Sequence, residues 1–590
     1  MAKYRFKASR LLMRLRKIIG NDQLVLSALA VLVGAGTGGG VILFRETIGF
    51  FQKLAFGSDD ELLYIQLINL AWWQIMLPPV IGGLVIGLFV HYLMPGRRPR
   101  GVADVMESMA LRSGRMSPKA GVGAALISAA SIGAGASVGR EGPAVHLGAM
   151  LGSLVSARFH LTRSLSRTLL GCGTAAAVAA SFNAPIAGAL FANEVVVGHY
   201  ALSAFAPIVI ASVTGTVISR AYYGDFPSFN VYEHQITSLL EFPAFIGLGI
   251  VCGILAILLL RSIFLVQDVG RKLPVPAWSL PAFAGFLIGA IGVFFPQVMG
   301  VGYGVTNLAL NSSLALPILI LLIMAKMTAT AISLGGGFGG GIFSPSMVIG
   351  ALTGAAYGIL ATSVFPELSS GAGAYAMIGM GAMAAATLGA PISTTLIIFE
   401  LTGDYTLTVA VMIAVVIASV ITQQAGLKSF FAGQLKRRGL DLDENFETTL
   451  LRAHKIRDVV AKDAARVTPD VTLEELREGL QHSTMGELFV VDSSDRLVGT
   501  ITLADLSDAA FDHDMDDLVC AADVARVHPP MLTLDDHLET ALTLMRDSGE
   551  EHIAVVDSPS SLLFIGCVHE TEVMAAYNHA LLQSRREEHY

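Results

Sequence analysis

The chain has little charge and little cysteine. Asp, Glu, Lys and Arg make up 15% of its 590 residues, whereas ordinary soluble domains hold roughly 25%. Hydrophobic residues reach 53%, and the mean hydropathy is +0.63. This composition argues against a soluble multidomain enzyme, and we expect no enzymatic activity. The four cysteines form no CxxC pair, so the sequence predicts no metal site, no disulfide framework and no bound cofactor.

The few charges are unevenly distributed. Residues 441–590 hold 31 acidic and 11 basic side chains, whereas residues 1–440 hold 16 and 28. An apolar, weakly basic part is thus followed by an acidic part, which predicts a membrane body with a soluble tail. We divide the chain into a basic N-terminal segment (1–22), a membrane domain (23–440), a linker (441–454), two tail domains (455–515 and 516–580) and a terminal segment (581–590).

The N-terminus lacks acidic residues before Asp22 but holds seven basic ones. The uncharged run Leu24–Phe44 that follows is long enough to span a bilayer. A secretory signal would have a shorter apolar core and a cleavage site, so we predict a retained first span. Basic residues here and at 436–438 place the N-terminus and the tail in the cytoplasm. We expect a multi-pass protein of the cell membrane, and the lack of long insertions suggests a bacterial inner membrane.

Two Gly/Pro motifs recur about two hundred residues apart. Gly139-Arg-Glu-Gly-Pro143 is matched by Gly341-Ile-Phe-Ser-Pro345, with further glycines at equal offsets. Ala184-Pro185-Ile186 is matched by Ala390-Pro391-Ile392, and a glutamate, Glu194 or Glu400, follows each proline by nine residues. Equal spacing in both pairs indicates one internal duplication. The alternative is that these glycines only permit tight helix packing.

Such interruptions at matching places indicate a substrate site made from discontinuous helices near the bilayer midplane. Half-helices that begin at Gly139 and Gly341 would aim free N–H groups and positive dipole ends at this site, which favours an anion. Glu141 would be a carboxylate inside the membrane, and therefore a candidate functional residue. When deprotonated it would occupy the place of the permeating anion, so we expect acid to open the pathway. The alternative is a structural ion pair with Arg140.

These motifs, with Phe182-Asn183-Ala184-Pro185, resemble the CLC family of chloride channels and chloride/proton antiporters over about residues 20–440. The resemblance implies a polytopic α-helical membrane protein of two inverted repeats with broken helices. It also implies a homodimer in the lipid bilayer, with one chloride pathway in each subunit and Glu141 as the gating glutamate. The anion-binding residues it implies are Gly139, Arg140, Glu141, Gly142, Ile342 and Phe343.

Three positions depart from the family's pattern. Val195 stands where antiporters usually carry an inner proton-binding glutamate. Glu194, one residue earlier, is the candidate substitute, and the alternative is that Glu194 and its repeat equivalent Glu400 cap helix ends. Phe431, or as the alternative Phe430, stands where the family has a tyrosine, and Arg100, before Gly101, stands where it has a serine. Both hydroxyls are thus replaced at the expected anion site, which Arg100, Gly101 and Phe431 would line. The alternative is that Arg100 snorkels to the membrane surface beside Arg97 and Arg98.

The non-acidic Val195 favours a passive chloride channel gated by protonation and voltage. The alternative is a chloride/proton antiporter of the same fold, in which water or Glu194 carries the proton. A remote alternative is a membrane-anchored nucleotide sensor that conducts nothing. We expect no nucleic-acid partner.

The acidic tail contains its own duplication, in which Leu488–Asp492 and Leu497–Thr502 are echoed by Ile553–Asp557 and Phe564–His569. This pattern resembles a tandem pair of α/β CBS domains. In members that bind adenine nucleotides, a Thr/Ser-x-x-Asp turn holds phosphate and ribose, and Thr502 and Asp505 fit it. The second copy has His569 and Glu572 instead, so the resemblance implies at most one such site. The alternative is a structural module for dimerisation and trafficking.

Overall fold

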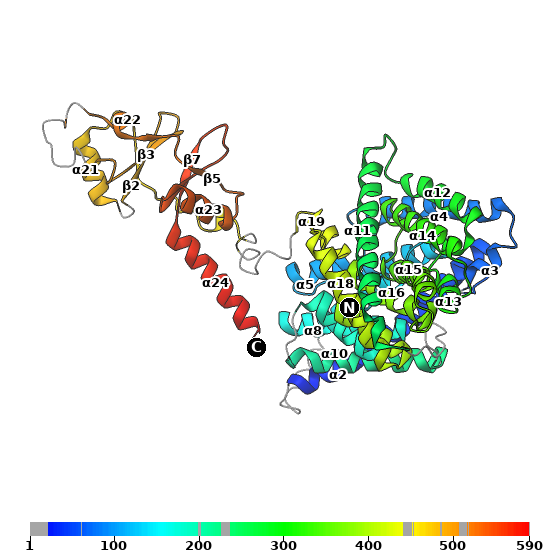
Figure 1. Ribbon diagram of the computed structural model, residues 1–590. Coiled ribbons are helices and arrows are strands. Elements are labelled where there is room, and N and C mark those ends of the chain that lie inside the picture. Colours follow the sequence, from blue (N-terminus) through cyan, green and yellow to red (C-terminus); the bar gives the residue numbers. More distant parts are fainter. Residues whose placement is uncertain are drawn as a thin grey trace. The chain divides into compact units, whose positions relative to one another are not determined.

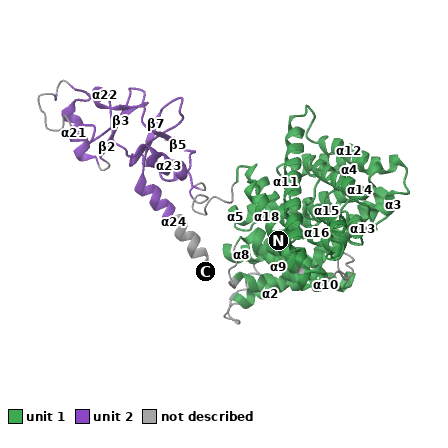
Figure 2. Ribbon diagram, viewed as in Figure 1, with its two compact units in different colours: residues 1–440 green, residues 441–590 purple. Residues whose placement is uncertain are grey.

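The computed structural model describes residues 22–588 apart from residue 61 and residues 199–201, 226–235, 441–450, 452–453, 484–485, 507–515 and 517–518. The chain forms two compact units, residues 1–440 and 441–590 (Figure 2). The division falls where the composition changes from apolar to acidic. The predicted N-terminal segment and linker lie almost entirely outside the described residues.

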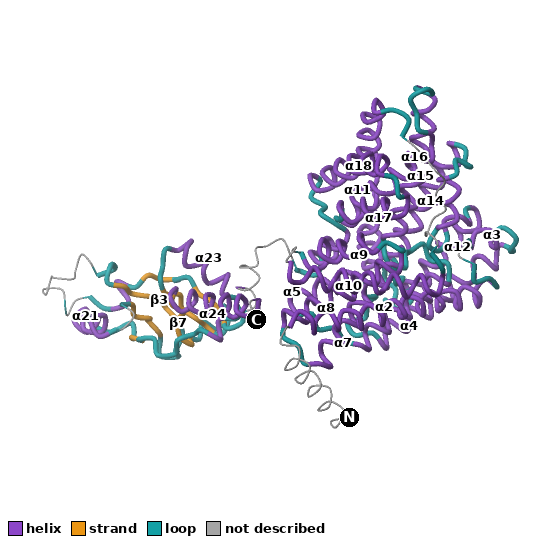
Figure 3. Tube along the Cα trace, turned by 90° about the horizontal axis from the view of Figure 1, so that it is seen from below, coloured by secondary structure: helices purple, strands orange, loops and turns teal. Residues whose placement is uncertain are grey.

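The first unit is built from helices (Figures 1 and 3). Nine helices of the described part are long and apolar enough to cross a membrane, which agrees with a polytopic membrane protein. The helices up to residue 223 are α2 (Asp22–Phe56), α3 (Leu63–Leu67), α4 (Trp72–Leu93), α5 (Val102–Leu111), α6 (Pro118–Gly133), α7 (Glu141–Phe159), α8 (Arg163–Phe182), α9 (Pro185–Phe191), the π-helix η1 (Ala192–Val197) and α10 (Leu202–Tyr223).

The later part of this unit repeats the arrangement. Its helices are η2 (Leu239–Glu241), α11 (Phe242–Lys272), α12 (Leu280–Phe294), η3 (Pro296–Val298), α13 (Tyr303–Leu310), α14 (Leu316–Gly335), α15 (Phe343–Val364), α16 (Gly371–Leu388), α17 (Pro391–Thr402), α18 (Tyr405–Gln424) and α19 (Phe430–Lys436). Helix α7 packs on α8 as α15 packs on α16, and α10 packs on α2 as α18 packs on α11.

Glycine allows the closest of these contacts. A Cβ on Gly148 of α7 would lie 2.2 Å from the carbonyl oxygen of Gly173 in α8. A Cβ on Gly350 of α15 would lie 2.3 Å from the carbonyl oxygen of Gly379 in α16. Both contacts fall on the glycines that the sequence repeat aligns. The motif glycines therefore do permit close helix packing, in addition to interrupting the helices.

Helices α9 and α17 lie antiparallel, which shows that the repeats are inverted. The Glu194 carboxylate, at the end of α9 and η1, accepts hydrogen bonds from the backbone N–H groups of Ile392 (3.0 Å) and Ser393 (2.8 Å) at the start of α17. The Glu400 carboxylate, near the end of α17, accepts from the N–H groups of Ile186 (2.9 Å) and Ala187 (2.7 Å) at the start of α9. Each repeat thus caps a helix of the other.

The second unit has two small sheets, with strand orders β1-β2-β3-β4 and β5-β6-β7. Strands β2 and β3 pair antiparallel, as do β6 and β7, and β1 and β5 join them in parallel. The elements are η4 (Ile456–Asp458), β1 (Arg466–Val467), α21 (Leu473–His482), β2 (Glu487–Val491), β3 (Leu497–Thr502), α22 (Ala521–Val524), β4 (Arg526–Val527), β5 (Met531–Thr533), α23 (Leu538–Ser548), β6 (His552–Val556), β7 (Phe564–His569) and α24 (Glu570–Glu588).

The two halves of the tail exchange short segments across the predicted border at 515/516. Strand β4, from the second predicted domain, pairs with β3 of the first. Conversely, Ile456 lies in the hydrophobic core of the second half. Helix α24 runs through residue 580. The exchange could not be predicted from the sequence because the exchanged segments are short and carry no strand alternation of their own.

Candidate functional site

Three helix N-termini meet at the first Gly/Pro motif. Gly142 lies in the first turn of α7, Gly341 lies just before α15, and Val102 is the first residue of α5. A Cβ on Gly142 would lie 3.1 Å from the Cα atom of Gly341 and 3.9 Å from the Cγ2 atom of Val102. The predicted helix starts at Gly139 and Gly341 are each two residues early, since α7 begins at Glu141 and α15 at Phe343. Gly139 and Gly341 pair with each other instead, through two N–H···O bonds of 2.7 Å.

Glu141 lies at the centre of this arrangement and is only 1% exposed. Its carboxylate accepts the Ser344 hydroxyl at 2.6 Å and the Tyr303 hydroxyl at 2.9 Å. It also passes close over Gly139, where a Cβ would lie 2.8 Å from Oε2. A residue larger than glycine at 139 would therefore displace the carboxylate.

Arg140 and Tyr303 connect this site to a cavity. The Arg140 guanidinium lies over the Tyr303 ring, 4.7 Å from its centroid, a cation–π contact. Both residues line a cavity of about 430 Å³, together with the charged residues Arg45, Glu46, Lys53 and Asp59. Tyr303 therefore lines the cavity and also donates a hydrogen bond to Glu141, the candidate gating residue.

The side chain of Phe343 brings the two repeats together at the start of α15. Its ring lies 4.8 Å from the Phe182 ring and 5.9 Å from the Phe191 ring, measured between centroids. Ile342 is fully buried beside it as the N-cap residue of α15. Backbone N–H groups of this first turn have no partner within their own helix. A bound anion would accept hydrogen bonds from these N–H groups.

Arg100 and Gly101 lie at the N-terminus of α5. The Gly101 N–H donates to the Asp104 carboxylate at 3.0 Å, so α5 caps part of its own N-terminus. Arg100 donates through Nη2 to the Pro95 carbonyl at 3.1 Å, while its buried Nε has no hydrogen-bond partner among the described residues. Asp104 forms an ion pair with Arg98 at 2.7 Å. This end of α5 is therefore a cluster of charges rather than the hydroxyl site that a serine would supply.

Phe431 is buried in α19, which packs on α5 and α16. Its neighbour Phe430 stacks on Phe264, with 5.9 Å between ring centroids. Phe430 thus lies against α11, and the Phe431 ring lies edge-on to Phe430 with 5.9 Å between centroids. A phenylalanine at this position supplies no hydrogen-bond donor.

Val195 lies in the π-helix η1 and is 8% exposed. Glu194, beside it, is engaged in capping α17 through Ile392 and Ser393, whose hydroxyl also donates to its carboxylate. The structure therefore gives Glu194 a structural contact at the position where a substitute proton acceptor was predicted.

Two residues that contact Glu141, Ser344 and Tyr303, are not among the site residues predicted from the sequence. Ser344 lies within the second motif, and its hydroxyl, a polar group in an apolar stretch, was a usable signal. Tyr303 follows Gly302, which has φ +98°, but nothing in the sequence connects it with a residue 162 positions away. Such a contact depends on the tertiary fold alone.

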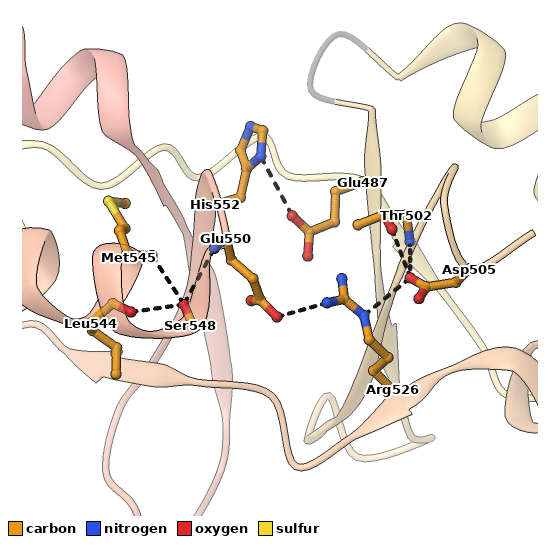
Figure 4. A network of polar contacts seen from close by, with 9 residues as sticks. All are labelled: Glu487, Thr502, Asp505, Arg526, Leu544, Met545, Ser548, Glu550 and His552. Atoms are coloured by element: carbon orange, nitrogen blue, oxygen red, sulfur yellow. Dashed lines mark hydrogen bonds and ion pairs between the residues drawn. The ribbon is translucent and has the colours of Figure 1, made fainter.

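The Thr502–Asp505 turn of the tail is closed by its own hydrogen bonds (Figure 4). The Asp505 carboxylate accepts from Thr502 N–H at 2.8 Å and from the Thr502 hydroxyl at 2.7 Å. It also accepts from Arg526 Nε at 3.1 Å, while Arg526 Nη1 donates to Glu550 at 2.9 Å. A ribose hydroxyl would have to compete with Arg526 for this carboxylate.

The fold and the site together define a polytopic membrane protein whose inverted repeats bring helix N-termini to a buried carboxylate. Residues 82–423 match the family described as voltage gated chloride channel, and residues 456–512 match the CBS domain. The chain belongs to the voltage-gated chloride channel family, known as CLC, and carries a C-terminal CBS region.

Named relatives agree with this assignment. The chain is 33% identical over 414 residues to a putative chloride channel protein, ClcB-like, of Ralstonia nicotianae, covering 70% of this chain and 96% of the relative. It is 32% identical over 400 residues to the voltage-gated ClC-type chloride channel ClcB of Escherichia coli strain K12, covering 67% of this chain and 95% of the relative.

Solved structures are similar as well. A slow cyanobacterial Cl⁻/H⁺ antiporter has a TM-score of 0.63 at 26% identity, covering 71% of this chain and 98% of that chain. A eukaryotic CLC transporter has a TM-score of 0.60 at 20% identity, covering 93% of this chain and 98% of that chain. The chain is therefore a chloride channel or transporter of the CLC type.

Proposed function

We propose that this chain passes chloride and related anions passively across a membrane, along a pathway that the Glu141 side chain blocks and releases. One observation carries the proposal: the buried Glu141 carboxylate lies where helix N-termini meet, held by the Ser344 and Tyr303 hydroxyls. Helix N-termini favour an anion, and here the anion is the chain's own side chain. Protonation removes its charge and frees the position for chloride.

The channel is favoured over the antiporter by the inner position. Val195 cannot carry a proton, and the Glu194 carboxylate already has three donors from Ile392 and Ser393. The antiporter stays as a second candidate because a similar solved structure, at 26% identity, is described as a Cl⁻/H⁺ antiporter. In that case a water chain past Val195 would carry the proton.

The test uses purified protein in chloride-loaded liposomes, with chloride efflux and external pH recorded together. Chloride that leaves without driven proton movement supports the channel, whereas protons driven uphill in a fixed ratio to chloride establish the antiporter. Glu141→Gln should abolish the acid activation. Absence of chloride flux in liposomes would refute transport altogether and leave the non-conducting sensor.

We propose that two copies assemble as a homodimer through α9, α10, α17 and α18. These adjacent helices expose an apolar face that includes Ile186, Val213, Val217, Ile392, Met412, Val416 and Val420. Native mass spectrometry from detergent micelles would give a mass of two chains. A single-chain mass at all protein concentrations would contradict the dimer.

We propose a location in the bacterial inner membrane, because the chain lacks long insertions. The basic flanks at residues 3–17 and 436–438 support an orientation with both termini in the cytoplasm. Cysteine labelling of intact cells tests the orientation. An adenine nucleotide at Thr502 and Asp505 is a further proposal, supported by the Thr-x-x-Asp turn. Calorimetry on the full chain with ATP, ADP and AMP tests it, and no heat at millimolar nucleotide would remove it.

A further inference from the structure

Lys326 is a fully buried lysine in a helix that is long and apolar enough to cross the membrane, α14. An ionisable side chain in such a place is costly and marks a candidate functional residue. Its Nζ donates to three backbone carbonyls, those of Val298 at 2.9 Å, Gly300 at 3.0 Å and Val301 at 3.5 Å. An ammonium group has three N–H donors, so each carbonyl has one.

The three carbonyls belong to one short segment, residues 298–302, that begins at the last residue of η3 and leads directly into α13. Gly300 and Gly302 have φ of +63° and +98°, a backbone conformation that glycine adopts without strain. A Cβ on Gly302 would lie 3.1 Å from Lys326 Nζ. This segment is also tied to the stretch before α7, because Gly300 N–H donates to the Gly135 carbonyl at 3.2 Å.

The first helical residue after this segment is Tyr303, whose hydroxyl donates to Glu141 at 2.9 Å. The same segment and Tyr303 line the 430 Å³ cavity. The ammonium of Lys326 therefore binds the carbonyls of this segment, and Tyr303, the residue that follows the segment, binds the Glu141 carboxylate. Only Gly302 separates the anchored carbonyls from Tyr303.

We propose that Lys326 is a positioning residue for the Glu141 gate. Its ammonium accepts no bond but donates to the carbonyls of Val298, Gly300 and Val301, and this fixes the position of Tyr303. Tyr303 in turn holds the Glu141 side chain in its blocking position by a hydrogen bond. This inference rests on the proposed gating by Glu141. Loss of the anchor lets Tyr303 move and weakens the hydrogen bond, so Glu141 leaves the blocking position more readily.

The test compares Lys326→Met, Tyr303→Phe and the double variant in the liposome assay across pH 4 to 8. One hydrogen bond contributes roughly 1 kcal/mol, so each single variant should raise chloride flux at pH 7 about fivefold and flatten its dependence on pH. The double variant should equal Tyr303→Phe alone, because Lys326 acts through Tyr303. Unchanged pH profiles, or effects that multiply in the double variant, would overturn the inference.

Two further variants keep the test decisive. Lys53→Met changes a lysine of the same cavity that is 66% exposed and pairs with Asp59, and it should leave the pH profile unchanged. If Lys326→Met does not fold, Lys326→Arg keeps the charge, but its planar fork cannot reach three converging carbonyls in the same way. It should give a smaller shift of the same sign, and an unchanged profile would count against the proposal.

A second readout separates this inference from the proposed function. With 3-fluorotyrosine at position 303, the ¹⁹F signal reports on the hydroxyl that binds Glu141, whether or not the protein transports anions. Glu141→Gln and Lys326→Met should both move this signal, and Lys53→Met should not. A signal that responds to Glu141→Gln but not to Lys326→Met would refute the role of Lys326 alone. Absence of chloride flux with a responding signal would refute only the transport function.

Discussion

The free energy of unfolding of the tail should fall as the pH rises, because the tail contains one buried carboxyl group. Glu487, on β2, is 3% exposed, and its Oε2 lies 3.4 Å from Nδ1 of His552 on β6 (Figure 4). Burial, and next the negative charge of Glu550, raise the pKa of Glu487 to about 7, although Arg526 acts in the opposite direction. We predict that Glu487→Gln removes most of the pH dependence of tail stability.

The sign and size follow from the difference between folded and unfolded chain. The folded tail holds the Glu487 proton more tightly than an unfolded chain, in which the pKa is about 4.5. The resulting stabilisation is fully present below pH 4.5 and is lost as the pH rises through about 7. A shift from 4.5 to 7 corresponds to about 3 kcal/mol at 1.36 kcal/mol per pKa unit. Burial also lowers the pKa of His552, so His552 does not compensate with a positive charge at neutral pH.

Hydrogen exchange of the full chain in detergent micelles measures this effect. After correction for intrinsic exchange, protection of β2 and β6 should fall by about two orders of magnitude between pH 5 and pH 8. Glu487→Gln should flatten this fall and raise protection at pH 8. Glu478→Gln, on the exposed side of α21, is the matched control and should keep it. The reasoning fails if wild-type protection is independent of pH, or if Glu487→Gln retains the full fall.

Three further changes test the membrane unit. Ser344→Ala removes a hydroxyl that donates to Glu141 and should raise chloride flux at pH 7 about fivefold to tenfold in liposomes; unchanged flux would mean that this bond does not hold the gate. Glu194→Gln should lower the free energy of unfolding by about 1–2 kcal/mol, measured in urea, while any ratio of proton to chloride movement stays the same. Gly148→Ala should cost about 3 kcal/mol or more because its Cβ would meet a backbone carbonyl at 2.2 Å. Gly39→Ala, where a Cβ has nothing within 4 Å, should be nearly neutral, and equal losses from both would refute the packing account.

Features that depend on composition and spacing could be predicted from the sequence. The change in charge at residue 440 separates the two units, because a membrane body excludes charge and a soluble tail needs it. The duplicated motifs place Glu141 and Phe343 at equivalent helix starts, since glycine and proline fix local backbone geometry. These features depend only on residues close together in the chain, and they can therefore be recognised in a single sequence.

Features that depend on contact between distant segments could not be predicted. Tyr303 contacts Glu141, and Lys326 contacts the segment before Tyr303, only because α13 and α14 pack beside α15. The exchange of β4 between the halves of the tail is equally invisible, since two residues carry no periodicity. The predicted helix starts are two residues early because the sequence does not reveal that Gly139 and Gly341 pair with each other.

The contacts of Glu194 bear directly on how a proton could move. Its carboxylate accepts the N–H groups of Ile392 and Ser393 at the start of α17, just as Glu400 satisfies the start of α9. The duplication thus gives both acids a structural reason to be present. A protonated Glu194 would lose part of this capping, at a cost of about 1–3 kcal/mol for each buried donor left without an acceptor. Proton movement coupled to chloride would therefore need water beside Val195 rather than Glu194, and Glu194→Gln in the liposome assay separates the two routes.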